Sequence, residues 1–199
     1  MRAGLIGCPH KGECEPGFMR INPDTPCIEN VAFKKESWIN NKRQFKRHIR
    51  NRWMHGHAAR AVDGSFDQSL HSCTVLDNFY VERPIWMVDL GRKAKISGVV
   101  MVTWQGKDQD PRTTYRDYMF NLDKLAVYVD NKGGRDRIDL ANNMCGFISR
   151  LNDALFRPKL HVQCMKPMEG RYLYIEAWGV PNRWNRLFSA VLCEVMVYE

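Results

Sequence analysis

Two short phrases, far apart in the chain, carry the oxygen-bearing side chains that are best suited to bind a metal ion. In the first phrase Asp63 precedes a glycine turn and Ser72 directly precedes Cys73, and in the second Cys193 directly precedes Glu194. If the two cysteines form a disulfide, the two carboxylates and the hydroxyl lie close together. Hard oxygen donors of this kind suit Ca²⁺. The two phrases therefore predict a structural calcium site rather than a catalytic centre.

The motifs that identify common enzyme classes are absent from the sequence. There is no Gly-x-Ser-x-Gly, no His-Glu-x-x-His and no glycine-rich phosphate loop. No pair of acids can be placed as in a glycosidase. His48, His55 and His57 lie close in sequence, but no cysteine or acid has the spacing that a metal site would need. We therefore expect a protein that is not an enzyme.

The length of the chain, 199 residues, suits one domain with a short extension. No apolar run approaches the roughly 18 residues that a membrane-spanning helix needs. The segment before Cys8 is too short for a signal peptide. We therefore expect that the leader of a secreted protein has been removed, or that the chain is part of something longer.

Seven cysteines without CxxC zinc spacing indicate an oxidising, extracellular compartment. The alternative is a cytosolic protein with reduced, buried cysteines. Residues 1–28 are rich in glycine and proline and contain Cys8, Cys14 and Cys27, so they predict a cysteine-clipped N-terminal extension. One bridge can form among these three, and we favour Cys14–Cys27. The odd total leaves one thiol unpaired or bonded outside this chain.

From residue 85 onward, most of the chain alternates with a period of two. Such alternation is typical of strands that bury one face in a β-sandwich. The run Ile96–Thr103 is almost continuously apolar, and Ile148, Leu151 and Leu155 indicate one short helix. The alternating segments are those around Trp86, Val88 and Leu90; Leu125, Val127 and Val129; Tyr172 and Tyr174; and Val191, Cys193, Val195 and Val197.

An ordered set of short phrases across residues 29–199 resembles the fucolectin, or F-type lectin, family, a relative of the coagulation-factor type C (discoidin) domain. Each phrase alone is weak, but the order is specific. The resemblance implies an all-β fold, a β-sandwich with jelly-roll connections, over residues 29–199. The phrases are Glu29-Asn30-Val31-Ala32, Ala61-Val62-Asp63-Gly64, Ser72-Cys73-Thr74, Trp86-Met87-Val88-Asp89-Leu90-Gly91, Asn142-Asn143-Met144-Cys145, Gly170-Arg171-Tyr172 and Cys193-Glu194-Val195.

The resemblance also implies two disulfides and one calcium site. The disulfides are Cys73–Cys193 and Cys145–Cys164. A plainer interpretation of Asp63 is that it caps the turn at Gly64. The implied calcium ligands are the side chains of Asp63, Ser72 and Glu194, completed by backbone carbonyls near Arg60, Ser65 and Cys193.

The residues that hold fucose in this family are replaced here. Fucose-binding members use a histidine just after the Ser-Cys-Thr phrase and two arginines that flank a short loop. Val75 stands at the histidine position, Gln105 at the first arginine, and Asn121 nearest the second. Losing three polar contacts of about 1–3 kcal/mol each leaves no useful affinity. We therefore expect no fucose binding.

The basic residues concentrate in one stretch, 34–60, whose nine cations and single acid match the net charge of the whole chain, +8. Phe45, Ile49 and Trp53 recur every four residues and predict a short amphipathic helix with a basic outer face. The alternative is an ordinary solvated surface. The cations that we assign to an anionic partner are Lys42, Arg43, Lys46, Arg47, Arg50 and Arg52.

These observations predict a non-catalytic extracellular recognition domain that binds a protein or an anionic glycan. A calcium-dependent lectin with altered sugar specificity is the second interpretation. A third is a protein that binds anionic lipid surfaces through the cationic stretch. Nucleic acid is not expected, because sulfated glycans suit a disulfide-bonded domain better. Two loops rich in arginine and aromatic residues, Lys107–Phe120 and Ala177–Ser189, are further candidates for partner contacts.

Overall fold

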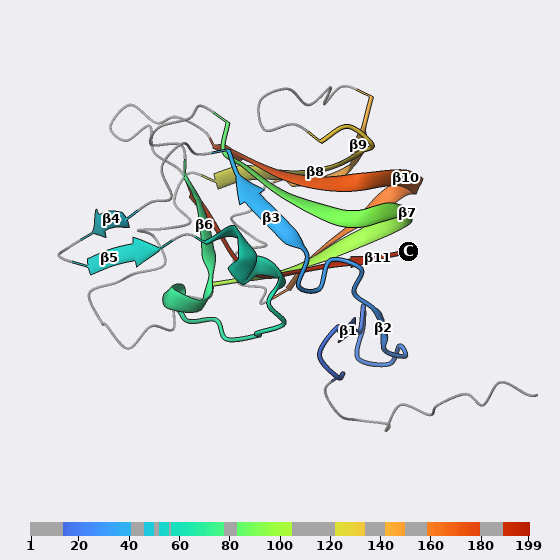
Figure 1. Cartoon of the computed structure of the whole chain (residues 1–199), viewed down its shortest axis with the longest axis horizontal. Coiled ribbons are helices and arrows are strands. Elements are labelled where there is room, and N and C mark those ends of the chain that lie inside the picture. Colours follow the sequence, from blue (N-terminus) through green and yellow to red (C-terminus); the bar gives the residue numbers. More distant parts are fainter. Residues whose placement is uncertain are drawn as a thin grey trace, which may run out of the picture.

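The computed structural model describes residues 14–40, 46–49, 52–55, 57–77, 83–104, 122–133, 142–149, 159–179 and 189–199. Within these ranges the chain forms eleven strands and two short 3₁₀ helices (Figure 1). The strands are β1 (Phe18–Met19), β2 (Ile28–Glu29), β3 (Glu36–Ile39), β4 (Lys46–Ile49), β5 (Arg52–His55), β6 (Thr74–Asp77), β7 (Ile85–Thr103), β8 (Leu122–Asp130), β9 (Met144–Ser149), β10 (Lys159–Gly179) and β11 (Ser189–Tyr198), and the helices are η1 (Ala58–Val62) and η2 (Leu70–Ser72).

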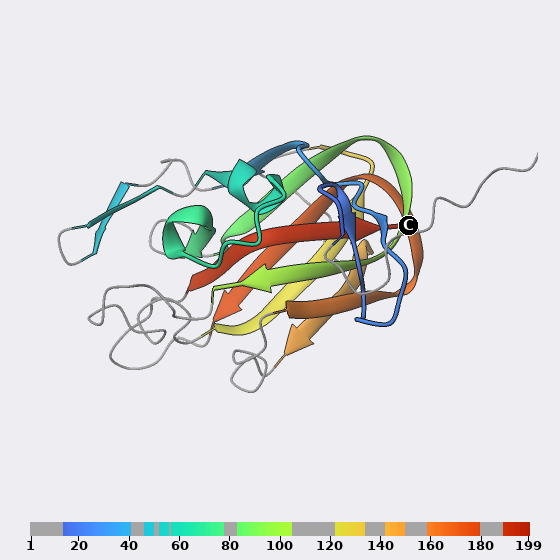
Figure 2. The ribbon, with the colours of Figure 1, turned by 90° about the horizontal axis from the view of Figure 1, so that it is seen from below.

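Two long strands, β7 and β10, run through both layers of the sandwich and bend at the same end (Figures 1 and 2). The first half of β7 pairs with β3 on one side and with the second half of β10 on the other. The second half of β10 pairs in turn with β8, and β8 pairs with β9. We call these strands the front sheet. The second half of β7 pairs with the first half of β10 and with β11, which pairs with β6. These form the back sheet.

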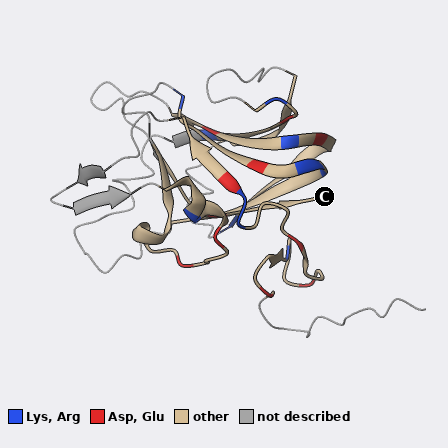
Figure 3. Ribbon diagram, viewed as in Figure 1, with Lys and Arg blue, Asp and Glu red and all other residues tan. Residues whose placement is uncertain are grey.

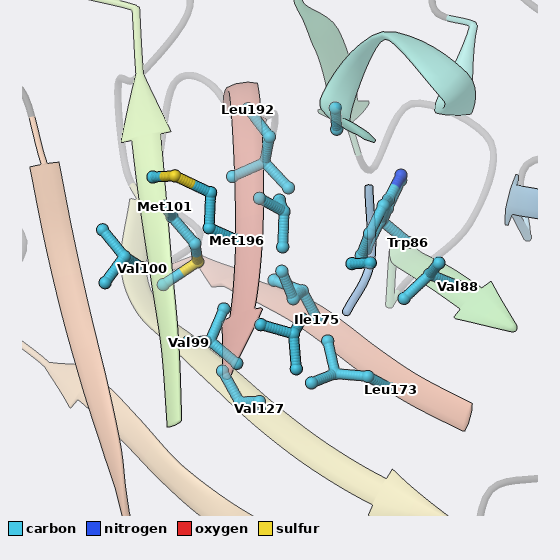
Figure 4. Packing of buried hydrophobic residues seen from close by; sticks show 14 of the residues in the cluster. Trp86, Val88, Val99, Val100, Met101, Val127, Leu173, Ile175, Leu192 and Met196 are labelled. Carbon is cyan, nitrogen blue, oxygen red and sulfur yellow. The ribbon is translucent and has the colours of Figure 1, made fainter. Parts of the chain in front are cut away.

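The core lies between the two sheets, and it is made by the residues that alternate in the sequence. Trp86 and Val88 of β7, Val127 of β8 and Ile175 of β10 enter it from the front sheet, and Val99 of β7 enters it from the back sheet (Figure 4). Each of these side chains is almost fully buried. The predicted alternating strands are therefore confirmed. Ile85–Leu90 and Ile96–Thr103 belong to one continuous strand.

The N-terminal extension packs against the sandwich. Asn30 accepts hydrogen bonds at Oδ1 from the backbone N–H groups of Val197 (2.9 Å) and Ala32 (3.1 Å), and Val31 donates to the carbonyl of Val197. Met19 of β1 is 2% exposed and belongs to the same core. The pairing of β1 with β2 crosses the expected boundary between residues 28 and 29, so the described part of the extension, residues 14–28, is joined to the domain that follows it.

Three disulfides link the described cysteines. Cys73–Cys193 joins the start of β6 to β11, with 4.0 Å between the Cα atoms, and Cys145–Cys164 joins β9 to β10. These are the two pairs that the resemblance implies. The third bond is Cys14–Cys27 in the extension, as favoured from the sequence. Cys8 lies outside the described residues.

The helix predicted from Phe45, Ile49 and Trp53 is wrong. Lys46–Ile49 and Arg52–His55 form an antiparallel hairpin, with Ile49 opposite Arg52. Ile49 and Trp53 favour strands over helices, so a spacing of four residues was too weak a signal to outweigh strand pairing. Phe45 lies outside the described residues.

The second helix prediction, for the segment between Cys145 and Cys164, is wrong at Ile148, the member of its apolar stripe that the structure describes. Ile148 belongs to β9 and pairs with Leu125 of β8, so the front sheet continues through this residue. Its apolar side chain packs against the core as a strand residue. The other two members of the predicted stripe, Leu151 and Leu155, lie outside the described residues. In the part of the chain that the structure describes, no helix is long and apolar enough to cross a membrane.

One end of the sandwich gathers the ends of most strands, and we call it the loop end. Strands β6, β9 and β10 finish at this end, and strands β8, β10 and β11 begin there. The register shows this, because residues at or near the strand ends pair with one another: Asp77 of β6 with Ser189 of β11, Lys124 of β8 with Ser149 of β9, and Lys159 of β10 with Val102 of β7. β7 begins and finishes there. The connections between β6 and β7, β7 and β8, β9 and β10, and β10 and β11 therefore all leave from the loop end.

Candidate functional site

The turn after η1 brings the two predicted acidic calcium ligands to one place. Gly64 has a φ of +84°, and a Cβ at this position would lie 2.5 Å from the ring of Phe33, so the turn requires glycine. The Gly64 N–H donates to Glu194 Oε2 at 3.2 Å, while Asp63 Oδ1 accepts from the N–H of Ser65 at 2.7 Å. Asp63 therefore caps its own turn and also lies beside Glu194.

Glu194 is a buried carboxyl group without a cationic partner among the described residues. It is 1% exposed, and burial, aided by the negative charge of Asp63, raises its pKa to about 8 although the Gly64 N–H acts in the opposite direction. A divalent cation between the two carboxyl groups would neutralise both. The chemistry of this pair therefore fits the calcium ion that the sequence predicts.

The third predicted side-chain ligand, Ser72, makes different contacts. Its hydroxyl donates to Asp67 Oδ2 at 2.6 Å and lies 3.0 Å from the hydroxyl of Ser69. The bond from Ser72, together with bonds from the backbone N–H and the hydroxyl of Ser69, lowers the pKa of Asp67. Asp67 was not among the residues predicted from the sequence, although aspartate followed by serine two residues later is a common turn signal.

The remaining expected calcium ligands are backbone carbonyls. Arg60 lies in η1, Ser65 lies in the turn after it, and Cys193 lies in β11 beside Glu194. Among the described residues, no three histidine, cysteine, aspartate or glutamate side chains form a metal-binding group. A calcium ion at this turn would therefore depend on carbonyl oxygens for much of its coordination.

The position of the family's fucose-binding histidine lies on β6. Val75 pairs with Val191 of β11, is partly buried and packs against the core. An apolar side chain in this place neither donates nor accepts a hydrogen bond. Gln105 and Asn121, the other two replaced positions, lie outside the described residues.

A second group of polar residues lies on the outer face of the front sheet. Glu176 of β10 is fully buried there and accepts three hydrogen bonds at Oε2, from Arg83 Nη2 (3.2 Å), Tyr128 OH (3.1 Å) and Trp178 Nε1 (2.9 Å). Burial and the adjacent Glu176 raise the pKa of Tyr128 to about 12. The Glu176 carboxyl group therefore contacts one cation and two neutral donors.

Two cations lie close to the indole ring of Trp178 at the loop end. The Arg83 guanidinium lies 4.4 Å from the ring centroid and the Lys124 ammonium lies 4.5 Å from it. Lys124 also lies 5.3 Å from the ring of Phe147, which is 53% exposed. We call Arg83, Lys124, Phe147, Glu176 and Trp178 the Trp178 cluster. Aromatic rings and cations together can bind flat, polar or anionic ligands.

Sequence analysis did not identify the Trp178 cluster. Trp178 was assigned to the loop Ala177–Ser189, but residues 177–179 belong to β10. The available signal was the period-two series Tyr172, Tyr174, Glu176 and Trp178, which places a glutamate among aromatic residues on one face of a strand. The other loop candidate, Lys107–Phe120, lies outside the described residues.

The predicted cationic row is divided by the hairpin. Lys46 lies in β4, as does Arg47, and Arg52 lies in β5. Lys42, Arg43 and Arg50 lie outside the described residues. In its described part, residues 46–49 and 52–55, the basic stretch is therefore not a helix face.

No protein-family model matches the sequence, and no curated protein is similar to it at a significant level. Solved structures do match. The lectin domain of lectinolysin, in complex with Lewis B antigen, is 22% identical with a TM-score of 0.54, over 86% of this chain and 96% of that chain. A fucolectin from striped bass (Morone saxatilis) serum is 22% identical with a TM-score of 0.55, over 84% of this chain.

The match covers 47% of the striped bass protein, so this chain spans about half the length of that lectin. A chitosan-binding module from a chitosanase/glucanase of Paenibacillus sp. IK-5 is 14% identical with a TM-score of 0.52, over 86% of this chain and all of that module. The fold predicted from the sequence is confirmed: the chain is an all-β, F-type lectin-like sandwich. These similarities define its scaffold as one that carbohydrate-binding modules share.

Proposed function

We propose that the protein is a non-catalytic, extracellular recognition domain that binds an anionic glycan and does not bind fucose. The observation that carries this proposal is that the scaffold resembles that of fucose-binding lectins, whereas the residue at their fucose-binding histidine position differs. The sandwich is that of fucose-binding lectins, yet Val75 packs against the core at the position of their histidine. A fold does not bring its ligand with it when the contacting residues change.

The extracellular setting is supported by the three disulfides, because such bonds persist in oxidising compartments. The non-catalytic role is supported by the lectin and carbohydrate-binding modules that share the scaffold. Both assignments agree with a domain whose loops, rather than its core, contact the partner.

A structural calcium ion is part of this proposal. Asp63 and Glu194 would hold it, with the Ser72 hydroxyl and carbonyls of Arg60, Ser65 and Cys193 as further donors. Its chemistry would be the neutralisation of two adjacent carboxylates. That would fix the turn at Gly64 to β11 beside the Cys73–Cys193 bond. The ion would stabilise the loop end without entering a reaction.

The anionic character of the glycan is supported by the charge of the chain. The stretch 34–60 carries as much net charge as the entire protein, +8. Concentrated like charge is unfavourable for folding and favourable for binding an anion. An acidic protein surface and an anionic lipid surface offer similar charge but lack the pyranose rings that lectin-like scaffolds bind.

The second candidate is a calcium-dependent lectin for a neutral sugar other than fucose. It is favoured by the partly exposed aromatic residues at the loop end, Trp178 and Phe147. A glycan array with and without chelator, run beside heparin and anionic liposome columns, separates the candidates. The proposal predicts binding to sulfated glycans and to heparin, but not to fucosylated glycans. Binding confined to neutral glycans or to liposomes would overturn it.

A further inference from the structure

We propose that Trp178, Lys124 and Phe147 form a subsite for one anionic pyranose, a sugar ring with a sulfate or carboxylate group, on the outer face of the front sheet. This inference rests on the proposed function and adds the residues that would hold one sugar of the glycan. It concerns a surface apart from the family's fucose position, because Val75 lies on β6 in the back sheet.

The sheet register brings these residues together from three strands. Trp178 of β10 pairs directly with Lys124 of β8, which pairs with Ser149 of β9. Two residues along, Ala126 pairs with Phe147. Because residues two apart on a strand share a face, Phe147 is a diagonal neighbour of Lys124. The subsite is therefore built on rigid strands and not on a loop.

The charge of Lys124 is not paired with an acid among the described residues. Its contacts there are with two rings, 4.5 Å from the Trp178 centroid and 5.3 Å from the Phe147 centroid. Arg83, in contrast, is bound to Glu176. Lys124 thus provides the positive charge of the cluster that remains available to an anion.

The indole of Trp178 is fixed before any ligand arrives. Its Nε1–H donates to the buried Glu176 at 2.9 Å, and the Arg83 guanidinium lies over the ring. A ring that is already ordered loses little conformational entropy on binding. Phe147 is 53% exposed and offers a second apolar surface beside the same ammonium group.

These features match the two halves of an anionic sugar. The C–H groups of a pyranose contact aromatic rings, while its sulfate or carboxylate pairs with an ammonium group. A free phosphate would use the charge but leave both rings without a contact. A neutral sugar would use the rings but leave the lysine charge without a partner. The anionic pyranose uses both.

The test measures affinity by calorimetry for a heparin-derived tetrasaccharide and for its chemically desulfated form, in which the uronate carboxyl groups have also been reduced to alcohols. The variants are Lys124→Gln and Phe147→Ser, with Lys132→Gln as the matched control. Lys132 is an exposed lysine just beyond the other end of β8, and the hydrogen bonds that the structure gives it are made by its backbone N–H and its backbone carbonyl. Melting temperatures establish that each variant is folded.

We expect Lys124→Gln and Phe147→Ser each to weaken binding of the sulfated tetrasaccharide by about fivefold to tenfold, and Lys132→Gln to have little effect. The loss for Lys124→Gln should be much smaller with the desulfated form. Wild-type binding with equal affinities for all variants would overturn this inference and leave the proposed function standing. An equal loss with both tetrasaccharides would overturn the anion assignment. No binding by the wild type would overturn both proposals.

Discussion

The Arg83 guanidinium forms an ion pair with Glu176, which is completely buried at the end of β10. Arg83 itself is about half exposed, so the pair spans from the solvent to the outer face of the front sheet. Tyr128 and Trp178 donate to the same carboxylate. Removing the cation would leave a buried anion with only neutral donors.

The variant Arg83→Met should therefore lower the free energy of unfolding by about 1–3 kcal/mol. This is less than the loss of about 3–5 kcal/mol that is typical when one partner of a fully buried ion pair is removed, because water partly screens Arg83. Urea denaturation measures this loss. The double variant Arg83→Met/Glu176→Gln removes both charges and should recover part of it. A single variant as stable as the wild type would show that the pair does not hold this face together.

Asp89 of β7 and Arg171 of β10 form a two-point ion pair, with both N–O distances at 2.7 Å, where acidic and basic residues lie side by side on these strands (Figure 3). The hydrogen bonds from Arg171 hold the pKa of Asp89 below its ordinary value. A carboxyl group whose pKa is lowered by folding stabilises the folded protein at pH values above its unfolded-state pKa of about 3.9. This stabilisation is lost as the pH falls from there through the lowered pKa of the folded state.

We therefore expect Asp89→Asn to be less stable than the wild type at pH 7, by at most about 1 kcal/mol because Arg171 is exposed. The difference should shrink as the pH falls below about 4. Unfolding free energies measured from pH 2 to pH 7 for the wild type and for Asp89→Asn give the two curves to compare. Parallel curves would contradict the assigned role of the ion pair.

Chelation of calcium should lower the melting temperature, because an ion that binds only the folded state stabilises it, by about 2.7 kcal/mol at 100 times its dissociation constant. The variant Asp63→Asn should abolish most of this shift. Asp24→Asn, at an exposed turn of the extension, is the control. Differential scanning calorimetry with and without chelator gives the answer. An unchanged calcium-dependent shift in Asp63→Asn would refute the site.

Free L-fucose should not bind at millimolar concentration, because Val75 supplies no hydrogen bond at the histidine position. Nuclear magnetic resonance titration with fucose measures this directly. Shifts of the resonances of Val75 and its neighbours that disappear with chelator would show that the altered pocket still binds the sugar.

The sequence predicted the strands well because each of them buries one face. Trp86, Val88 and their counterparts on β8, β10 and β11 follow a period of two, and the structure places them in one core. It did not reveal that β7 and β10 each run through both sheets. The hairpin of β4 and β5 was missed because its apolar residues also fit a helical spacing.

The candidate sites were predictable only in part. Asp63 and Glu194 followed from ordered phrases, whereas the contact between Ser72 and Asp67 depends on how a short turn folds. The Trp178 cluster could not be foreseen as a unit. Its five members come from four strand ends, at Arg83, Lys124, Phe147 and residues 176–178, and only the sheet register makes them neighbours.

The most direct test of the central claim, recognition of an anionic glycan, is elution from a heparin column. The wild type should be retained at low salt and released as salt rises, because the Debye length shortens to about 8 Å at physiological ionic strength. A variant with Lys46, Arg47 and Arg50 replaced by glutamate should elute at markedly lower salt and keep its calcium-dependent melting shift. A wild type that passes through unretained, or a variant that elutes with the wild type, would contradict the account.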